Sequence, residues 1–303
     1  MTDSPVNPAG EARPEGPAVG SEIFRAFVAG AGQMGAGIAQ VLGQAGLSVY
    51  LYDLNQELAQ RGYEVIHRNL ARSVAKGRLR EEERQAALGR IRAVCDLSEA
   101  AQADLVVEAI AEDLQAKAEL FRRLDQLAPP QVIFASNTSS LSITRLAAST
   151  RRPERFVGLH FMNPVPVMSL VEVIRGQLTS PETFRTAWGL VVRLGKTPVE
   201  VQDYPGFVAN RVLIPMINEA IFCVMEGVAK PEDVDTVLKL GANHPMGPLQ
   251  LADFIGLDTC LAILDVMYRD LGDPKYRAAP LLRRMVQAGL LGRKSGRGFY
   301  QYA

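Results

Sequence analysis

The segment from Phe24 to Asp53 constrains the fold more than any other part of the chain. An apolar run leads into Gly30-Ala31-Gly32-Gln33-Met34-Gly35, a helical pattern follows to Ala45, and a second apolar run closes on Asp53. A strand, a glycine turn, a helix, a strand and an acid in this order are typical of the βαβ unit that binds the pyrophosphate of a dinucleotide. A glycine-rich turn without a ligand is the alternative, and the strand, helix and acid around the turn favour the nucleotide.

Each glycine of this turn has a separate expected task. Gly30 permits the tight turn, Gly32 lets backbone N–H groups approach the phosphates, and Gly35 lets the helix pack closely on the strand. Gln33 and Met34 lie in the same turn, just before the new helix, whose free N–H groups and positive dipole end favour an anion. We therefore predict that all five residues bind the cofactor.

Asp53 indicates which dinucleotide is bound. An acid at the tip of the second strand accepts hydrogen bonds from the adenosine ribose, and its charge repels a 2′-phosphate. No arginine or lysine follows within the next few residues to attract such a phosphate. The sequence therefore predicts NAD rather than NADP, and a binding titration that favoured NADP would overturn this.

Length and charge limit the possible functions. A chain of 303 residues is typical of two domains. Lysine plus arginine equals aspartate plus glutamate, at 33 each, so no overall field favours nucleic acid or an acidic membrane. No apolar run approaches the ~18–20 residues that span a bilayer. The three cysteines, Cys95, Cys223 and Cys260, lack metal-ligand spacing. We therefore expect reduced thiols, a cytoplasmic location and no metal.

The remaining pattern divides the chain. Residues 1–22 are rich in proline, glycine, alanine and glutamate, and we expect them to be disordered. Strands alternate with helices over residues 23–204, which predicts a Rossmann-type, doubly wound, mostly parallel sheet. Strand signals stop at Asp203-Tyr204-Pro205-Gly206, so residues 205–303 are predicted to form an all-helical domain. Its first helix, Phe207 to Glu226, is apolar almost all round with a narrow polar stripe through Arg211, Asn218, Glu219 and Glu226. Such a helix must be buried on several sides, which predicts a homodimer.

A helical hairpin follows Asp53. It is predicted to consist of a helix from Asn55 to Lys76, a break at Gly77 and a second helix from Glu81 to Leu88. The hairpin carries the basic residues Arg61, His67, Arg68, Arg72, Lys76, Arg78, Arg80 and Arg84. These residues could form a solvated helix face or bind a phosphate-bearing substrate, and electrostatics alone does not decide between the two.

His160 is the best candidate for an acid–base group. It ends a predicted strand, two prolines then force a turn, and Glu172 lies at a similar distance in the returning strand. A hairpin therefore brings the two side chains together, and the carboxylate would orient the imidazole. A hydrogen-bonded structural histidine is the alternative.

Two further polar residues are placed where a substrate would lie. Ser139 follows a strand at the carboxyl edge of the sheet and can donate a hydrogen bond, although serine-rich loops are often only turns. Asn210 lies in the first turn of the apolar helix, where it could also be a cap or a satisfied core amide.

The motifs GAGQMGAGIAQ, SNTSSLSI, GLHFMNPVPVMSLVEVI, DYPGFVANR, GANHPMGPLQLADFIGLD and GRKSGRGFY closely resemble the 3-hydroxyacyl-CoA dehydrogenase family, in particular its bacterial 3-hydroxybutyryl-CoA members. The resemblance covers about residues 23–303. It implies a Rossmann-type domain with an inserted helical hairpin, followed by a helical dimerisation domain.

The resemblance also implies roles for individual residues. The catalytic histidine falls on His160, its acidic partner on Glu172, and the substrate-contacting serine and asparagine on Ser139 and Asn210. The family's NAD contacts fall on Asp53, Glu112, Lys117, Asn163 and Lys294, and Lys76 matches a coenzyme A contact in the hairpin.

The implied reaction is the NAD-dependent interconversion of (S)-3-hydroxyacyl-CoA and 3-oxoacyl-CoA. A gulonate-type sugar-acid dehydrogenase of the same superfamily is the nearest rival, and the SNTSSLSI motif and the basic hairpin favour an acyl-CoA. A non-catalytic NAD-binding scaffold is a rival of another class.

Overall fold

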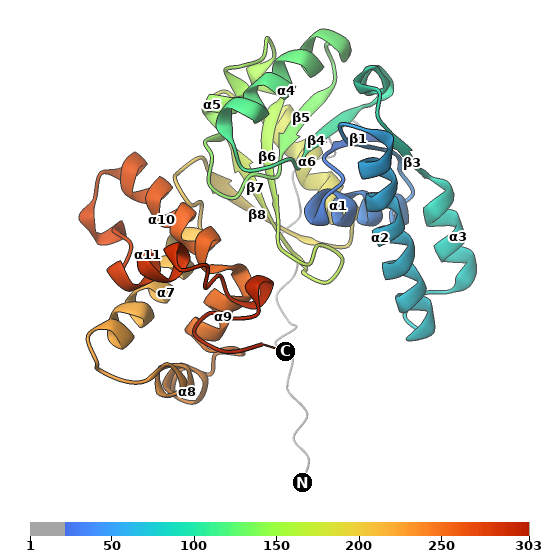
Figure 1. Ribbon diagram of the computed structural model, residues 1–303. Coiled ribbons are helices and arrows are strands. Elements are labelled where there is room, and N and C mark those ends of the chain that lie inside the picture. The colour runs from blue at the N-terminus through green and yellow to red at the C-terminus, as the bar shows by residue number, and fades with distance from the viewer. Residues whose placement is uncertain (1–21, 303) are drawn as a thin grey trace, which may run out of the picture.

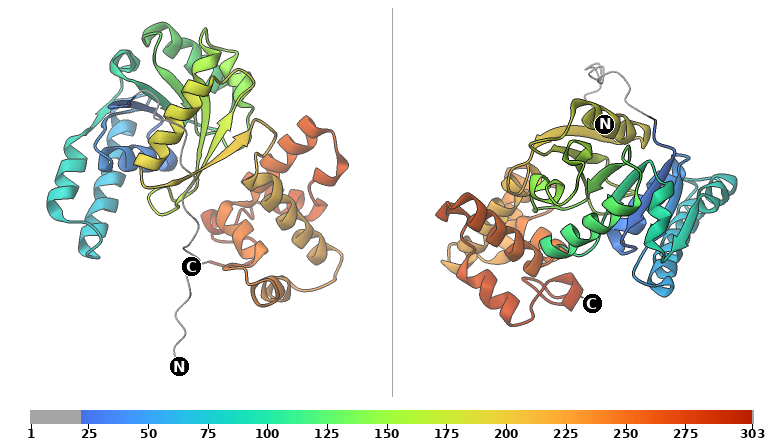
Figure 2. Two further views of the ribbon diagram at one scale, coloured as in Figure 1. Left: turned by 180° about the vertical axis from the view of Figure 1, so that it is seen from behind. Right: turned by 90° about the horizontal axis from the view of Figure 1, so that it is seen from above.

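The computed structural model describes residues 22–302. Apart from Glu22, the extension expected to be disordered lies outside the described residues. Within them, an α/β domain with a central sheet is followed by a group of helices beside it (Figures 1 and 2).

The sheet has eight strands in the order β3-β2-β1-β4-β5-β6-β7-β8. Only the β6–β7 pair is antiparallel among neighbouring strands. The strands are β1 (Arg25–Ala29), β2 (Ser48–Tyr52), β3 (Ile91–Val94), β4 (Leu105–Glu108), β5 (Ile133–Ser136), β6 (Phe156–Phe161), β7 (Leu170–Arg175) and β8 (Thr197–Gln202). The order of the first six strands is that of a dinucleotide-binding domain, with its switch point between β1 and β4. The predicted Rossmann-type fold is confirmed.

Helices cover both faces of this sheet, which explains why its central strands are continuous apolar runs. One apolar layer joins the sheet to α1 (Gln33–Gln44), α2 (Gln56–Ala75), α3 (Glu81–Gly89) and α6 (Pro181–Arg193). The second layer joins it to α4 (Leu114–Leu127) and α5 (Ile143–Ala147). The short 3₁₀ segment Leu97–Gln102, which the sequence pattern did not predict, contributes to the second layer.

The inserted hairpin consists of α2 and α3. Asn55 caps α2 by accepting a hydrogen bond from the N–H of Leu58, and Gly77, with φ +67°, ends it. Only four residues of α2 are buried, and the hairpin extends along one side of the sheet, away from the helical domain (Figures 1 and 2).

The C-terminal part consists of α7 (Ala209–Met225), α8 (Pro231–Gly241), α9 (Pro248–Ile255), α10 (Leu257–Leu271) and α11 (Pro280–Gln287). They enclose an apolar core of their own. This arrangement confirms the predicted helical C-terminal domain.

One residue of the polar stripe on helix α7 is fully buried. Asn218, assigned to a polar stripe, is 1% exposed; its amide donates to the carbonyl of Arg277 and accepts from the N–H of Ala279. A segment distant in sequence thus supplies the partners that this buried amide needs.

Candidate active site

The glycine turn between β1 and α1 has the shape that a dinucleotide needs. Gly30 has φ +103°, and a Cβ there would lie 2.6 Å from the carbonyl oxygen of Ala109. A Cβ on Gly35 would lie 1.7 Å from the carbonyl oxygen of Gly30. Beside Gly32 the space is open, and no side chain caps the first turn of α1. Free N–H groups therefore face an open space at the carboxyl edge of the sheet, which fits the pyrophosphate of NAD.

Asp53 lies beside this turn. One carboxylate oxygen accepts a hydrogen bond from the N–H of Ala31 at 2.8 Å, and the other accepts from the N–H of Leu54 at 2.8 Å. The acid is therefore fixed at the ends of β1 and β2, where the sequence placed the adenosine ribose.

His160 and Glu172 lie directly opposite each other on β6 and β7. Nδ1 of the imidazole lies 2.7 Å from one carboxylate oxygen of Glu172. The other oxygen accepts hydrogen bonds from the N–H groups of Val208 and Ala209, both at 3.0 Å. The carboxylate therefore links the imidazole to the start of the helical domain. The hairpin pairing expected from the sequence is present.

The environment of Glu172 favours the charged carboxylate. Burial alone raises its pKa, because the side chain is 2% exposed. The hydrogen bond with His160 and the two backbone N–H groups outweigh burial, so the pKa of Glu172 lies below its ordinary value.

The ring of Phe207 packs beside the imidazole. The two ring centroids are 5.8 Å apart, and Phe207 is buried in a left-handed conformation with φ +52°. Nε2 of His160 has no hydrogen-bond partner within residues 22–302. A ring held through Nδ1 and packed beside Phe207 presents Nε2 as the atom that can exchange a proton.

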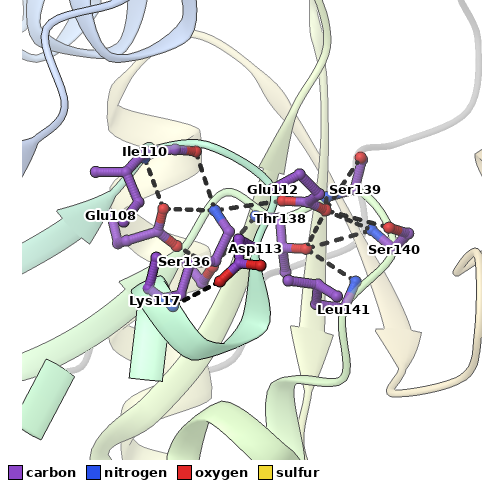
Figure 3. A network of polar contacts seen from close by, with 11 residues as sticks. Glu108, Ile110, Glu112, Asp113, Lys117, Ser136, Thr138, Ser139, Ser140 and Leu141 are labelled. Atoms are coloured by element: carbon purple, nitrogen blue, oxygen red, sulfur yellow. Dashed lines mark hydrogen bonds and ion pairs between the residues drawn. The ribbon is translucent and has the colours of Figure 1, made fainter. Parts of the chain in front are cut away.

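Ser139 and Asn210 are brought together from the two domains. The side-chain amide of Asn210 donates to the carbonyl oxygen of Ser139 at 2.8 Å. Glu112 accepts hydrogen bonds from the backbone N–H of Ser139 at 3.0 Å and of Ser140 at 3.2 Å, and from the hydroxyl of Thr138 (Figure 3). The loop that carries Ser139 is therefore held by Glu112.

Glu112 in turn forms an ion pair with a lysine that is buried beside Glu108 (Figure 3). Lys117 is 1% exposed, and its ammonium lies 2.5 Å from Glu108 and 3.3 Å from Glu112. Burial raises the pKa of Glu108, which also accepts a hydrogen bond from Ser136 at 2.6 Å. The pKa of Glu112 is lowered, because Lys117 and the loop donors outweigh burial. The Lys117 ammonium thus faces two carboxylates, and its contact with NAD stays a prediction.

Two other predicted cofactor residues lie on separate segments. Asn163 accepts a hydrogen bond from the side chain of Gln33 at 3.1 Å, which places it beside the start of α1. Lys294 forms an ion pair with Asp258 inside the helical domain. Its predicted contact with NAD stays a prediction.

The charge of the hairpin is smaller than its basic residues alone suggested. It also contains glutamates, and the structure pairs Arg61, Arg80 and Arg84 with Glu57, Glu83 and Glu81. Within the described residues, Arg72, Lys76 and Arg78 are exposed and form no ion pair. These three residues, near the turn between α2 and α3, are the cations left for a phosphate.

Three supporting residues were missed by the sequence reasoning. Glu108 ends β4, Phe207 packs on His160, and Asp203 accepts hydrogen bonds from the N–H groups of Ile143 and Thr144 at the start of α5. The position of Glu108 at the carboxyl end of a central strand was the one available signal.

Comparison with known proteins assigns the family. The sequence model of the 3-hydroxyacyl-CoA dehydrogenase NAD binding domain matches residues 25–204, and that of the C-terminal domain matches residues 206–302. The chain belongs to the 3-hydroxyacyl-CoA dehydrogenase family. It is therefore an NAD-dependent oxidoreductase, as the resemblance implied.

Members of this family resemble the chain over nearly its full length. A probable 3-hydroxybutyryl-CoA dehydrogenase of Bacillus subtilis (strain 168) is 60% identical over 93% of this chain and 98% of the relative. The mitochondrial hydroxyacyl-coenzyme A dehydrogenase of Homo sapiens is 45% identical over 91% of this chain and 90% of the relative. The crystal structure of (S)-3-hydroxybutyryl-CoA dehydrogenase from Ralstonia eutropha superposes with a TM-score of 0.91 at 48% sequence identity. The match covers 93% of this chain and 100% of the Ralstonia chain.

The part of the chain that the structure describes shows neither a membrane-spanning helix nor a cluster of metal ligands. Among residues 22–302, no helix is long and apolar enough to cross a membrane. In the same part of the chain, histidine, cysteine and acidic side chains form no group that could hold a metal ion.

Proposed function

We propose that the enzyme interconverts (S)-3-hydroxybutyryl-CoA and acetoacetyl-CoA, with His160 as the general base and acid. The observation that carries this proposal is the imidazole held through Nδ1 by Glu172, with Nε2 unpartnered. The relatives named for a four-carbon acyl-CoA support the substrate.

In the oxidation direction, Nε2 of His160 takes the proton of the substrate hydroxyl. Glu172 keeps the imidazole oriented and balances the positive charge that it acquires. The Ser139 hydroxyl and the Asn210 amide position the reacting oxygen and stabilise its developing negative charge. Bound NAD would supply the acceptor for the hydride from C3. Gly30, Gly32, Gln33, Met34, Gly35 and Asp53 would hold its pyrophosphate and adenosine.

The exposed cations Arg72, Lys76 and Arg78 support an acyl-CoA rather than a sugar acid. A coenzyme A carries several phosphates, and cations without ion-pair partners on an exposed turn can meet them. A gulonate offers one carboxylate and needs no such group.

A steady-state comparison tests the substrate. NADH oxidation is followed with 3-oxoacyl-CoA substrates from C4 to C16. We expect the C4 substrate to give the highest kcat/KM. Gulonate with NAD serves as the rival substrate. A higher kcat/KM with gulonate, or no turnover of any acyl-CoA, would refute the proposal.

The pH dependence of a Glu172→Gln variant tests the positioning carboxylate. We expect kcat to fall by about 10²-fold or more, because the amide no longer balances a charged imidazole.

The same variant also tests the charge of Glu172 through stability. A carboxyl whose folded pKa is lowered stabilises the fold above its unfolded pKa, near 4.3, and loses this contribution as pH falls through the folded value. The variant should therefore be less stable than the wild type at pH 7, with the difference closing below about pH 4. Equal stability of the two proteins at pH 7 would argue against a charged Glu172.

We propose that residues 23–204 form the NAD-binding domain and that residues 205–303 form the substrate and dimerisation domain. The homodimer predicted from α7 would form through this second domain. Support comes from apolar side chains that the single chain leaves in solvent, among them Val212, Val237 and Leu240, at 67%, 64% and 82% exposure. Large apolar side chains exposed on two helices of the same domain, α7 and α8, support association through this domain.

Changing Val212 to glutamate is expected to convert a dimer into a monomer, since the charge would be buried at the proposed interface. Light scattering at micromolar concentration measures the mass of both proteins. Leu178→Glu, at a position 60% exposed on the other domain, is the matched control and should leave the mass unchanged. A monomeric wild type, or a dimeric Val212→Glu variant, would contradict this interface.

A further inference from the structure

Lys196, which has no role in the site described above, forms hydrogen bonds to the loop that follows β6, the strand of His160. This loop, residues 162–169, connects β6 to β7. The ammonium of Lys196 donates to the carbonyl oxygens of Val165 and Met168, both at 2.6 Å. Burial lowers its pKa. Within the described residues it forms no ion pair, so its charge is directed to the loop backbone.

The rest of the loop offers few other attachments at this end. Its own backbone closes a turn, in which the carbonyl of Pro164 accepts from the N–H groups of Val167 and Met168. Val167 and Met168 are 74% and 41% exposed, so their side chains contribute little packing. At this end of the loop the carbonyl of Ser169 also accepts a hydrogen bond from the N–H of Thr197 at 2.7 Å, and Lys196 adds two side-chain hydrogen bonds to the loop backbone.

The same loop also contacts the cofactor-binding helix. Val165 is 2% exposed and packs so closely on α1 that a Cβ on Gly37 would lie 2.8 Å from it. Asn163 is joined to Gln33 by the 3.1 Å hydrogen bond described above. One loop thus connects Lys196 to the start of α1.

We propose that Lys196 is a positioning residue that holds Asn163 against the nicotinamide half of the dinucleotide. The inference rests on the proposed function, which assigns Asn163 to the cofactor. Asp53, at the end of β2, marks the adenosine side of the sheet. Strand β6 lies on the other side of the switch point between β1 and β4, so the loop that follows β6 lies on the nicotinamide side.

The binding of two ligands separates this role from a general structural one. NADH contains the nicotinamide half, whereas ADP-ribose lacks the nicotinamide ring. Lys196→Met is expected to raise the Kd for NADH about tenfold and to leave the Kd for ADP-ribose within about twofold. Lys230→Met, at an exposed lysine remote from the loop, is the matched control and should change neither.

A double-mutant cycle tests whether Lys196 acts through Asn163. If it does, Lys196→Met should weaken NADH binding much less in an Asn163→Ala background than in the wild type. Lys196→Gln, which keeps a shorter donor, provides the same measurement if the methionine variant does not fold.

The proposal is overturned if NADH binding is unchanged, if ADP-ribose binding weakens equally, or if the two substitutions are additive. No acyl-CoA is present in these titrations. A failure of the proposed dehydrogenase activity would therefore appear separately, as absent turnover in a wild type that still binds NADH.

Discussion

Replacing His160 with alanine is expected to lower kcat for acetoacetyl-CoA reduction by about 10²–10⁴-fold, the usual contribution of a positioned acid or base. The imidazole is hydrogen-bonded to Glu172 and packs beside the Phe207 ring, and the small alanine side chain disturbs neither partner's backbone. The loss should therefore fall on the proton transfer itself. NADH oxidation followed by absorbance gives kcat, and fluorescence titration gives the Kd for NADH.

Two controls separate catalysis from damage. The Kd for NADH should stay within about twofold of the wild-type value, since His160 is 7% exposed and serves no predicted cofactor contact. His244→Ala, at a half-buried histidine in the helical domain, should keep kcat near that of the wild type. A His160→Ala enzyme that retained a tenth or more of the wild-type kcat would refute the assignment.

The second large effect concerns stability. Lys117→Met should lower the free energy of unfolding by about 3–5 kcal/mol at pH 8, because it leaves the fully buried Glu108 without its cation. Urea unfolding measures the loss. Glu108 responds by binding a proton more readily, so its folded pKa lies further above the unfolded value. Such a group destabilises the fold above its unfolded pKa and not below it, so the loss should shrink as pH falls toward about 4.3.

Matched variants make this prediction specific. The double variant Glu108→Gln/Lys117→Met removes both charges and should recover much of the lost stability. Arg122→Met removes one partner of an exposed pair with Glu119 and should change stability by less than about 1 kcal/mol. A Lys117→Met loss as small as that of Arg122→Met, or one independent of pH, would contradict the account of this cluster.

Local signals carried most of the fold. The glycine turn and Asp53 lie within one continuous βαβ segment, so residue types and spacing were sufficient to predict it. The His160–Glu172 pairing could be anticipated because only a proline turn separates the two strands, and an antiparallel hairpin then sets the register.

Features that depend on distant segments could not be obtained in this way. Asn218 matched a polar stripe by helical periodicity, but its partners Arg277 and Ala279 lie some sixty residues further along. The hydrogen bond from Lys196 to the carbonyl oxygen of Val165 likewise joins two segments that no local sequence pattern relates. The charge of the hairpin was misjudged for another reason: its basic residues were counted without the glutamates that neutralise several of them.

A crystal structure of the enzyme with NAD and acetoacetyl-CoA would test the central claim most directly. We expect Nε2 of His160 to lie within hydrogen-bond distance of the oxygen on C3, with Nδ1 still bound to Glu172 and the nicotinamide ring on the other side of C3. A bound substrate whose C3 oxygen lay far from His160, or an imidazole turned away from Glu172, would contradict the proposed mechanism.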